Sequence, residues 1–439
     1  MTVARTKPRH LLLIAFSFPP SRASGTYRPL GLANYLVNRG WDVTVISPPA
    51  ETITQYFGTV DNTLLKAIDE RVHVTRVPMP MAGMHLPLHD HGWFQANFPV
   101  VHKMARSRLT SWPFRDNVMP WVPGVVRAGL KISRRKPVDI VLATGNPWSA
   151  FVAAYLICRK IRKPYAMDYR DSWTLDEFTG ERAFPVGSTE DKWERRLQNS
   201  AAVLTFVNEP QRRWHSEQNP EIADRTSVVE NGWDPDLLGE PTYQPPPADR
   251  PLRFGYLGTV TDLQPHAETW EAWQAARRDP ILEGATATIR GHLGFFRGSV
   301  NRTYALIPDG VAGITYGGPV GKTEVRGVYD SFDVILLIVA SSEYVTSGKV
   351  YECMATGKPI VAIHTPETAA AEPMAGYPLA HRIDSVDPAA IEKALLAAAH
   401  TARTYTLEDF QAAKAYGERY TRSAQFASLV DTLEGITGE

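Results

Sequence analysis

The segment from Val345 to Val361 reads VTSGKVYECMATGKPIV, and its pattern decides the fold of the region around it. An apolar run, Val334 to Ala340, precedes it, and apolar residues recur inside it at helical spacing until Gly357. After Gly357, the residues Pro359-Ile-Val resume an apolar run typical of a buried strand. The segment therefore predicts a strand, a loop, a helix and a second strand.

The start of this predicted helix also predicts a function. A helix that begins near Ser347 and Gly348 presents unpaired amide N–H groups, through Val350, at the carboxyl end of the preceding strand. Lys349 adds a positive charge, and Glu352 lies one turn further in, where a carboxylate can accept hydrogen bonds from a ribose. These residues predict a site for a phosphate-bearing donor. The alternative is an ordinary surface ion pair between Lys349 and Glu352.

The same alternation of strands and helices runs through the whole chain of 439 residues, which is longer than a single core usually allows. It predicts an α/β protein with two Rossmann-like domains. A stretch rich in Pro and Gly over 237–251 is typical of a semi-rigid linker. We therefore expect an N-terminal domain over 1–236, a C-terminal domain over 252–406 and a last helical segment over 407–439.

Short apolar runs predict the strands of both sheets. In the first domain they lie at 10–16, 41–46, 71–77, 138–143, 164–169 and 202–207. In the second they begin at Leu252 and continue near 285–290, 311–316, 334–339 and 359–363. Ligands of such sheets bind beyond the carboxyl ends of the strands, so functional residues are expected there and, with two domains, in a cleft.

Composition narrows the class of protein. Lys plus Arg and Asp plus Glu number 47 each, so no overall field attracts nucleic acid, and we expect no nucleic-acid partner. The only two cysteines, Cys158 and Cys353, lie in apolar helical patterns, which favours a reducing compartment over a disulfide framework. No apolar run approaches the ~18 residues that span a bilayer. We expect a cytoplasmic protein, with peripheral contact at the inner face of the membrane left open.

Four motifs occur in order along the chain. They read PPSRASGTYR from Pro19 to Arg28, YRDSW from Tyr169 to Trp173, VENGWD from Val229 to Asp234, and SGKVYE from Ser347 to Glu352. Together they resemble the landmarks of family 4 glycosyltransferases with the GT-B fold, and agreement of four ordered motifs is much more specific than any one of them.

The resemblance implies a nucleotide-sugar donor bound by the second domain, an acceptor bound by the first, and retention of anomeric configuration. The acceptor is expected to be a glycan, a lipid-linked glycan or a small molecule, and the last helix is expected to return to the first domain. Two alternatives stay open. One is a GT-B nucleotide-sugar epimerase, and the other is a non-catalytic protein that binds sugar nucleotides.

The candidates for contact with the acceptor hydroxyl are Asp171 and then Asp168, because both lie at the carboxyl end of the strand over 164–169, where the family places such a residue. The alternative for Asp171 is a structural pair with Arg170.

Further donor-binding candidates lie in both domains. Gly25 lets the main chain approach a phosphate, and Arg28 could reach the same anion or simply be solvated. In the second domain, Gly258 and Thr259 end the first strand, but the basic pair that the family usually has there is absent. Arg290 at the end of the next strand is the expected substitute, together with Lys349. The family often has a further glutamate, and the part of Glu343 is left open because its spacing to Glu352 differs by one residue.

We expect no required metal. Asp234-Pro-Asp236 follows an Asn-Gly turn and is expected to shape the connector, and His85, His89, Asp90 and His91 lie in a Gly- and Pro-marked loop without helical ligand spacing. The segment 84–121 mixes aromatic and basic residues without clear periodicity. It could line an acceptor pocket or enter a lipid interface, and an irregular packed subdomain is the alternative.

Overall fold

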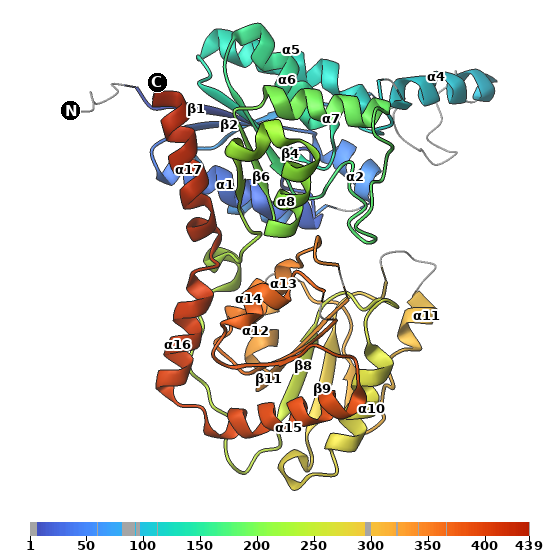
Figure 1. The fold of residues 1–439 in the computed structure, drawn as a ribbon, viewed down its shortest axis with the longest axis vertical. Helices are drawn as coiled ribbons and strands as arrows, with labels where there is room; N and C mark the ends of the chain where they lie inside the picture. The colour runs from blue at the N-terminus through green and yellow to red at the C-terminus, as the bar shows by residue number, and fades with distance from the viewer. Residues whose placement is uncertain are drawn as a thin grey trace. The chain divides into compact units, whose positions relative to one another are not determined.

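The computed structural model describes residues 7–58, 60–80, 93, 97–111, 113–294, 300–321, 324–340, 342–365 and 367–438. The chain folds into two compact units, each built on a parallel sheet (Figure 1). Unit 1 comprises Met1–Val229 and Phe426–Glu439, and unit 2 comprises Glu230–Gln425.

Unit 1 has a seven-stranded sheet in the order β3-β2-β1-β4-β5-β6-β7, with all neighbours parallel. The strands are β1 (His10–Ile14), β2 (Asp42–Ser47), β3 (His73–Arg76), β4 (Ile140–Gly145), β5 (Tyr165–Tyr169), β6 (Val203–Phe206) and β7 (Thr226–Val228). The helices are α1 (Tyr27–Asn38), α2 (Ala50–Phe57), α4 (Pro99–Ser111), α5 (Val122–Arg135), α6 (Ser149–Ile161), α7 (Thr189–Ser200) and α8 (Glu209–Gln218).

The strands of unit 1 read as continuous apolar runs because both faces of the sheet are covered. Leu12 and Ile14 of β1 pack in one core with α5 and α6, while Leu11 and Leu13 pack in another with α1. The second core also receives α17 (Arg422–Gly438), through Phe426, Leu429, Val430 and Leu433. The last helix of the chain thus helps to close the core of unit 1.

Unit 2 has a six-stranded sheet in the order β10-β9-β8-β11-β12-β13, again parallel throughout. The strands are β8 (Arg253–Leu257), β9 (Thr286–Arg290), β10 (Ile314–Tyr316), β11 (Val334–Val339), β12 (Ile360–His364) and β13 (Ala380–Ile383). The helices are α9 (Pro235–Leu238), α10 (His266–Ala276), α11 (Val300–Tyr304), α12 (Val325–Asp330), α13 (Gly348–Met354), α14 (Ala371–Ala375), α15 (Pro388–Thr404) and α16 (Leu407–Glu418).

Helices cover both faces of this sheet as well. Phe254 of β8 and Leu336 of β11 share a core with α10 and α15, whereas Ile335 and Leu337 of β11 share a core with α13 and α16. The segment 334–361 therefore folds as β11, loop, α13 and β12, as its pattern predicts.

The boundaries of the units differ in detail from the expected domain limits. The division falls between Val229 and Glu230, so the Pro-rich stretch 237–251 lies inside unit 2. The final segment joins unit 1 only from Phe426, since α16 packs in unit 2 on α13. The apolar face of α16 decides this difference, because Phe410 and Ala413 are buried in the core of unit 2.

Candidate functional site

In unit 2 the start of α13 lies against the carboxyl end of β8. The Lys349 ammonium donates to the Leu257 carbonyl over 3.1 Å. A Cβ at Gly258 would lie 2.8 Å from Lys349 Cε and 2.6 Å from the Tyr256 hydroxyl. Gly258 therefore makes room for the lysine, and the structure brings these two predicted residues together.

The amides at the start of α13 are less open than the sequence suggests. Ser347 caps the helix, because its hydroxyl accepts from the Lys349 amide at 3.4 Å and its carbonyl accepts from the Val350 amide at 3.2 Å. A side chain at Gly348 would meet no atom within 4 Å. The amides of Lys349 and Val350 are thus used inside the helix cap, while the space beside Gly348 is open, and the anion-binding role of this helix start stays a prediction.

Arg290 extends the same edge from β9. The Gly258 amide donates to the Arg290 carbonyl over 2.8 Å, and a Cβ at Gly317 would lie 2.8 Å from Arg290 Nη1. The buried Nε of Arg290 makes no hydrogen bond to any part of the chain that the structure describes. Lys349 thus lies beside Gly258 through its side chain, whereas Arg290 contacts Gly258 through its main chain and its guanidinium lies beside Gly317. The role of both cations as substitutes for the missing basic pair stays a prediction.

Two other predicted residues of unit 2 already have partners. The Thr259 carbonyl accepts from the Tyr256 hydroxyl at 2.8 Å. The Tyr329 hydroxyl donates to Glu352 Oε2 over 3.5 Å, a long contact to a half-buried side chain, and the predicted bond from Glu352 to a ribose stays a prediction. Glu343 is half-buried in the loop between β11 and α13.

In unit 1 the structure joins Arg28 to Asp168. The Arg28 guanidinium donates to both Asp168 carboxylate oxygens, with the shortest distance 2.7 Å, and to the Val229 carbonyl at 2.8 Å. Thr205 donates to Asp168 over 2.7 Å. Burial acts to raise the pKa of Asp168, but the charge and hydrogen bonds of Arg28, helped by Thr205, outweigh it and hold this pKa below its ordinary value.

Both members of this pair are buried, at 3% and 2% exposure. A buried ion pair with satisfied hydrogen bonds is a fixed part of the fold, and removing one member leaves a charge without compensation. Asp168 and Arg28 thus support the fold of unit 1, and the catalytic and donor-binding roles expected of them from the sequence stay predictions.

Asp171 has the opposite surroundings. Its side chain is exposed just beyond the end of β5, while the next four residues, Ser172 to Leu175, are buried. Beside it, the Arg170 guanidinium donates to the Asn146 carbonyl, and its Nη1 lies 1.5 Å from where a Cβ at Gly25 would be. Gly25 therefore makes room for Arg170, a function that the sequence does not reveal.

Three glutamates with raised pKa values were not singled out from the sequence. Burial, and then the charge of Asp171, raises the pKa of Glu177 to about 8. Burial raises the pKa of Glu194 to about 7, against hydrogen bonds from Thr174 and Tyr169. Burial and the charge of Glu372 raise the pKa of Glu230 to about 7. Glu230 lies in the VENGWD motif, and this motif is the sequence signal that could have identified it as a candidate residue.

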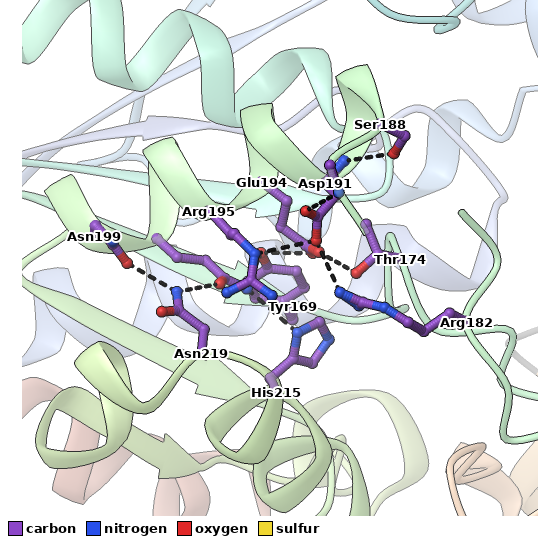
Figure 2. Close-up of polar contacts among 12 residues, drawn as sticks. Tyr169, Thr174, Arg182, Ser188, Asp191, Glu194, Arg195, Asn199, His215 and Asn219 are labelled. Atoms are coloured by element: carbon purple, nitrogen blue, oxygen red, sulfur yellow. Dashed lines mark hydrogen bonds and ion pairs between the residues drawn. The ribbon is translucent and has the colours of Figure 1, made fainter. Parts of the chain in front are cut away.

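Glu194 belongs to a buried polar network between β5, α7 and α8 (Figure 2). The Tyr169 hydroxyl donates to Glu194 over 3.0 Å and accepts from Gln198 over 3.1 Å. Arg182 and Arg195 both donate to Asp191, at 2.8 and 3.1 Å. The network fixes the loop after β5 on the two helices.

An exposed apolar and basic surface lies on and before α4. Phe98, Val100, Val101 and Met104 are all exposed, and Lys103 lies among them. The sequence from 93 to 115 contains four Lys or Arg residues and no Asp or Glu. Within the described ranges, no helix is both long and apolar enough to cross a membrane.

The candidate metal ligands lie partly inside and partly outside the residues that the structure describes. His85, His89, Asp90 and His91 lie outside the described residues. Elsewhere in the described chain, no group of three or more His, Cys, Asp or Glu side chains could hold a metal ion. Asp234 caps α9 by accepting from the Asp236 amide at 3.0 Å, and it pairs with Arg422 at 3.0 Å. It shapes the connector, as the Asn-Gly turn suggested.

Comparison with known proteins gives one family match. Residues 25–232 match the model of the glycosyl transferase 4-like domain. No curated protein matches the sequence.

Solved structures resemble the whole chain at low sequence identity. A glycosyltransferase from Rickettsia africae has a TM-score of 0.64 and 14% identity, with 98% of each chain covered. HepE of Anabaena, solved with UDP and glucose, has a TM-score of 0.59 and 15% identity, covering 97% of this chain and 99% of that one. A putative UDP-N-acetylglucosamine 2-epimerase from Listeria monocytogenes has a TM-score of 0.54 and 12% identity, covering 98% and 96%. These similarities establish the GT-B fold.

Proposed function

We propose that this chain, a glycosyltransferase of the GT-B type whose residues 25–232 match the glycosyl transferase 4-like domain, moves a sugar from a nucleoside-diphosphate sugar to an acceptor hydroxyl. The observation that carries the proposal is the Lys349 ammonium beside Gly258 at the carboxyl end of β8. A UDP sugar is the donor we propose to test first, because HepE, which shares this fold at 15% identity, was solved with UDP and glucose.

The proposed reaction uses charge stabilisation. The acceptor oxygen forms a bond to the anomeric carbon, and the bond from that carbon to the phosphate oxygen breaks, with its electron pair leaving on the diphosphate. Lys349 and Arg290 would stabilise the charge that develops on the diphosphate. The Asp171 carboxylate would accept the hydrogen bond, and then the proton, of the acceptor hydroxyl. Retention of configuration is a part of the proposal that rests on the family resemblance, and independence from a metal is a part that rests on the lack of metal-ligand spacing in the sequence.

The decisive experiment is a screen of UDP-, GDP-, dTDP- and ADP-sugars, following release of the nucleoside diphosphate by mass spectrometry with and without candidate acceptor sugars. Acceptor-dependent release together with a glycoside product is the expected result. Release without acceptor, with an epimerised sugar, would identify the epimerase alternative. Binding without turnover by any acceptor would identify the non-catalytic alternative.

The proposal extends to the cellular setting. Cys158 and Cys353 are both free and buried, which supports a reducing compartment such as the cytoplasm. The basic and apolar surface of α4 fits an anionic membrane surface, where a lipid-linked acceptor would lie. Sedimentation with anionic vesicles should carry down the wild-type chain but less of Lys103→Glu. Equal sedimentation of both would remove the membrane part of the proposal.

A further inference from the structure

Asp171 stands at the exposed start of a segment that is otherwise immobilised. Trp173 stacks on Trp148, with ring centroids 5.7 Å apart and planes 8° apart. The Thr174 hydroxyl donates to Glu194 within the network between β5, α7 and α8 (Figure 2). An exposed carboxylate on such a segment has a defined direction before any ligand arrives.

Ser172, the residue next to Asp171, is fixed by two contacts, one made directly with α8 and one made through Glu177, which α8 also contacts. Its hydroxyl contacts His215 Nε2 at 3.0 Å. Its amide donates to Glu177 Oε1 over 2.6 Å, and Gln211 Nε2 donates to the same oxygen over 2.5 Å. Gln211 and His215 are four residues apart, so both project from the same side of the helix.

The protonation of His215 follows from its neighbours. Burial, with a smaller effect of the charge of Arg182, lowers the pKa of His215 to about 3, so the ring is neutral near pH 7. Gln198 Nε2 lies 3.3 Å from Nδ1 and can only donate, so Nδ1 accepts. The proton therefore resides on Nε2, which donates to the Ser172 hydroxyl.

We propose that Glu177 and His215 are positioning residues that hold Asp171 toward the acceptor hydroxyl by fixing Ser172 at its amide and at its hydroxyl. This inference rests on the proposed function and deepens its acceptor side. Neither residue needs to touch the substrate, because Glu177 holds the amide and His215 holds the hydroxyl of Ser172, the residue beside Asp171.

Ser172 and Gln211 both donate to Glu177 Oε1, an acceptor that a neutral carboxyl group and a carboxylate both provide. Because its pKa is raised to about 8, Glu177 is mainly neutral at pH 7. The charges acting on Glu177 are those of Asp171 and Asp176 in its own loop, while α8 faces it with the neutral amide of Gln211. Gln at this position keeps the accepting oxygen and removes the titration.

The test compares Glu177→Ala and Glu177→Gln with Glu181→Gln, a control on an exposed side chain of the same loop. Acceptor KM, kcat, donor affinity and the pH profile of kcat are measured for each. We expect Glu177→Ala to lower kcat/KM for the acceptor by about 100-fold with unchanged donor affinity, because a small misplacement has that scale of effect. We expect wild-type activity to decline above about pH 8, because deprotonation of Glu177 adds a second negative charge that interacts with Asp171. We expect Glu177→Gln to retain activity at pH 7 and to lack this decline.

The outcomes distinguish failure of the positioning role from failure of the proposed function. Wild-type kinetics and an unchanged pH profile in Glu177→Ala would overturn the positioning role alone. Absence of any donor turnover in the wild type would overturn the proposed function and, with it, this inference. If Glu177→Ala does not fold, Glu177→Gln still decides, because an unaltered fall in its activity above pH 8 contradicts the inference.

Discussion

The carboxyl edges of the two sheets use their charged residues in opposite ways. In unit 1 the buried cation Arg28 is bound to the buried carboxylate Asp168, and the exposed charge is the carboxylate of Asp171. In unit 2 two cations, Lys349 and Arg290, pack against the main chain of Gly258 and Gly317. The difference teaches that a charge at a strand end acquires its role from what surrounds it: a buried counter-ion indicates support of the fold, whereas the two cations of unit 2 lie beside glycines at the edge proposed for the donor.

The largest expected effect comes from breaking the buried pair of unit 1. Asp168→Ala leaves Arg28 buried without its carboxylate, and should lower the free energy of unfolding of unit 1 by about 3–5 kcal/mol. Denaturant unfolding followed by hydrogen–deuterium exchange separates the two units. Asp171→Ala is the matched control three residues away, and it should change stability by less than about 0.5 kcal/mol while abolishing transfer. Equal destabilisation by both substitutions would contradict the contrast between them.

The second prediction concerns the cations of unit 2. Lys349→Ala should weaken UDP binding by about 10- to 100-fold, since a charge-assisted hydrogen bond contributes about 1.5–3 kcal/mol. Stability should change little, because the ammonium is half-buried and has no role in the core. Titration calorimetry with UDP measures the effect, and Lys393→Ala, an exposed lysine on α15, is the control. Unchanged affinity in Lys349→Ala would remove the donor site from this edge.

Most strands of the two sheets could be predicted from the sequence, but the contacts of the charged residues at their ends could not. Continuous apolar runs such as His10–Ile14 and Val334–Val339 mark strands covered on both faces. The edge strands β7 and β13 were missed because Thr226–Val228 is three residues long and Ala380–Ile383 is interrupted by His and Arg. Short edge strands are only partly buried, so they lack the apolar signal.

In the candidate site, too, the sequence predicts residues that carry a local signal and misses contacts between residues far apart in the chain. Lys349 and Gly258 were predicted from local patterns, because a helix start and a strand end carry their own signals. The Arg28–Asp168 pair joins residues 140 positions apart, and the bond between Glu177 and Gln211 joins residues 34 apart. Nothing in local spacing reports such contacts, so sequence reasoning assigned Asp168 and Arg28 to the ligand and gave Glu177 no role.

The third prediction uses pH to compare the units. The folded-state pKa of Glu194 is raised from 4.5 to about 7, so its contribution to stability is fully present below pH 4.5 and is lost as pH rises through about 7. Unit 1 also contains Glu177, whereas Glu230 is the corresponding carboxyl of unit 2. His215 of unit 1 has a lowered pKa and acts in the opposite direction, so the effect of Glu194 is measured as the difference in unfolding free energy between the wild type and Glu194→Gln. Between pH 5 and 8 the contribution of Glu194 to this difference should fall by roughly 2–3 kcal/mol, and a contribution that grows over this range would show the sign to be wrong.

The smallest expected effect is that of Gly25→Ala, and comparing it with Gly258→Ala tests whether both glycines keep space for the donor. At Gly258 an added methyl group meets the Tyr256 hydroxyl at 2.6 Å and Lys349 Cε at 2.8 Å, and that hydroxyl is already bonded to Thr259 and Gln264. Since the tyrosine cannot move easily, Gly258→Ala should displace Lys349 and weaken UDP binding.

At Gly25 the methyl group meets only the guanidinium end of Arg170, a flexible side chain that can swing away. Gly25→Ala should therefore reduce the free energy of unfolding by less than about 1 kcal/mol, below the usual effect of overpacking, and leave UDP affinity unchanged. Calorimetry on the two variants decides the question. If Gly25→Ala weakens UDP binding as much as Gly258→Ala does, Gly25 approaches the donor phosphate as the family resemblance implies, and unit 1 contributes to the anion site as well as presenting the carboxylate of Asp171.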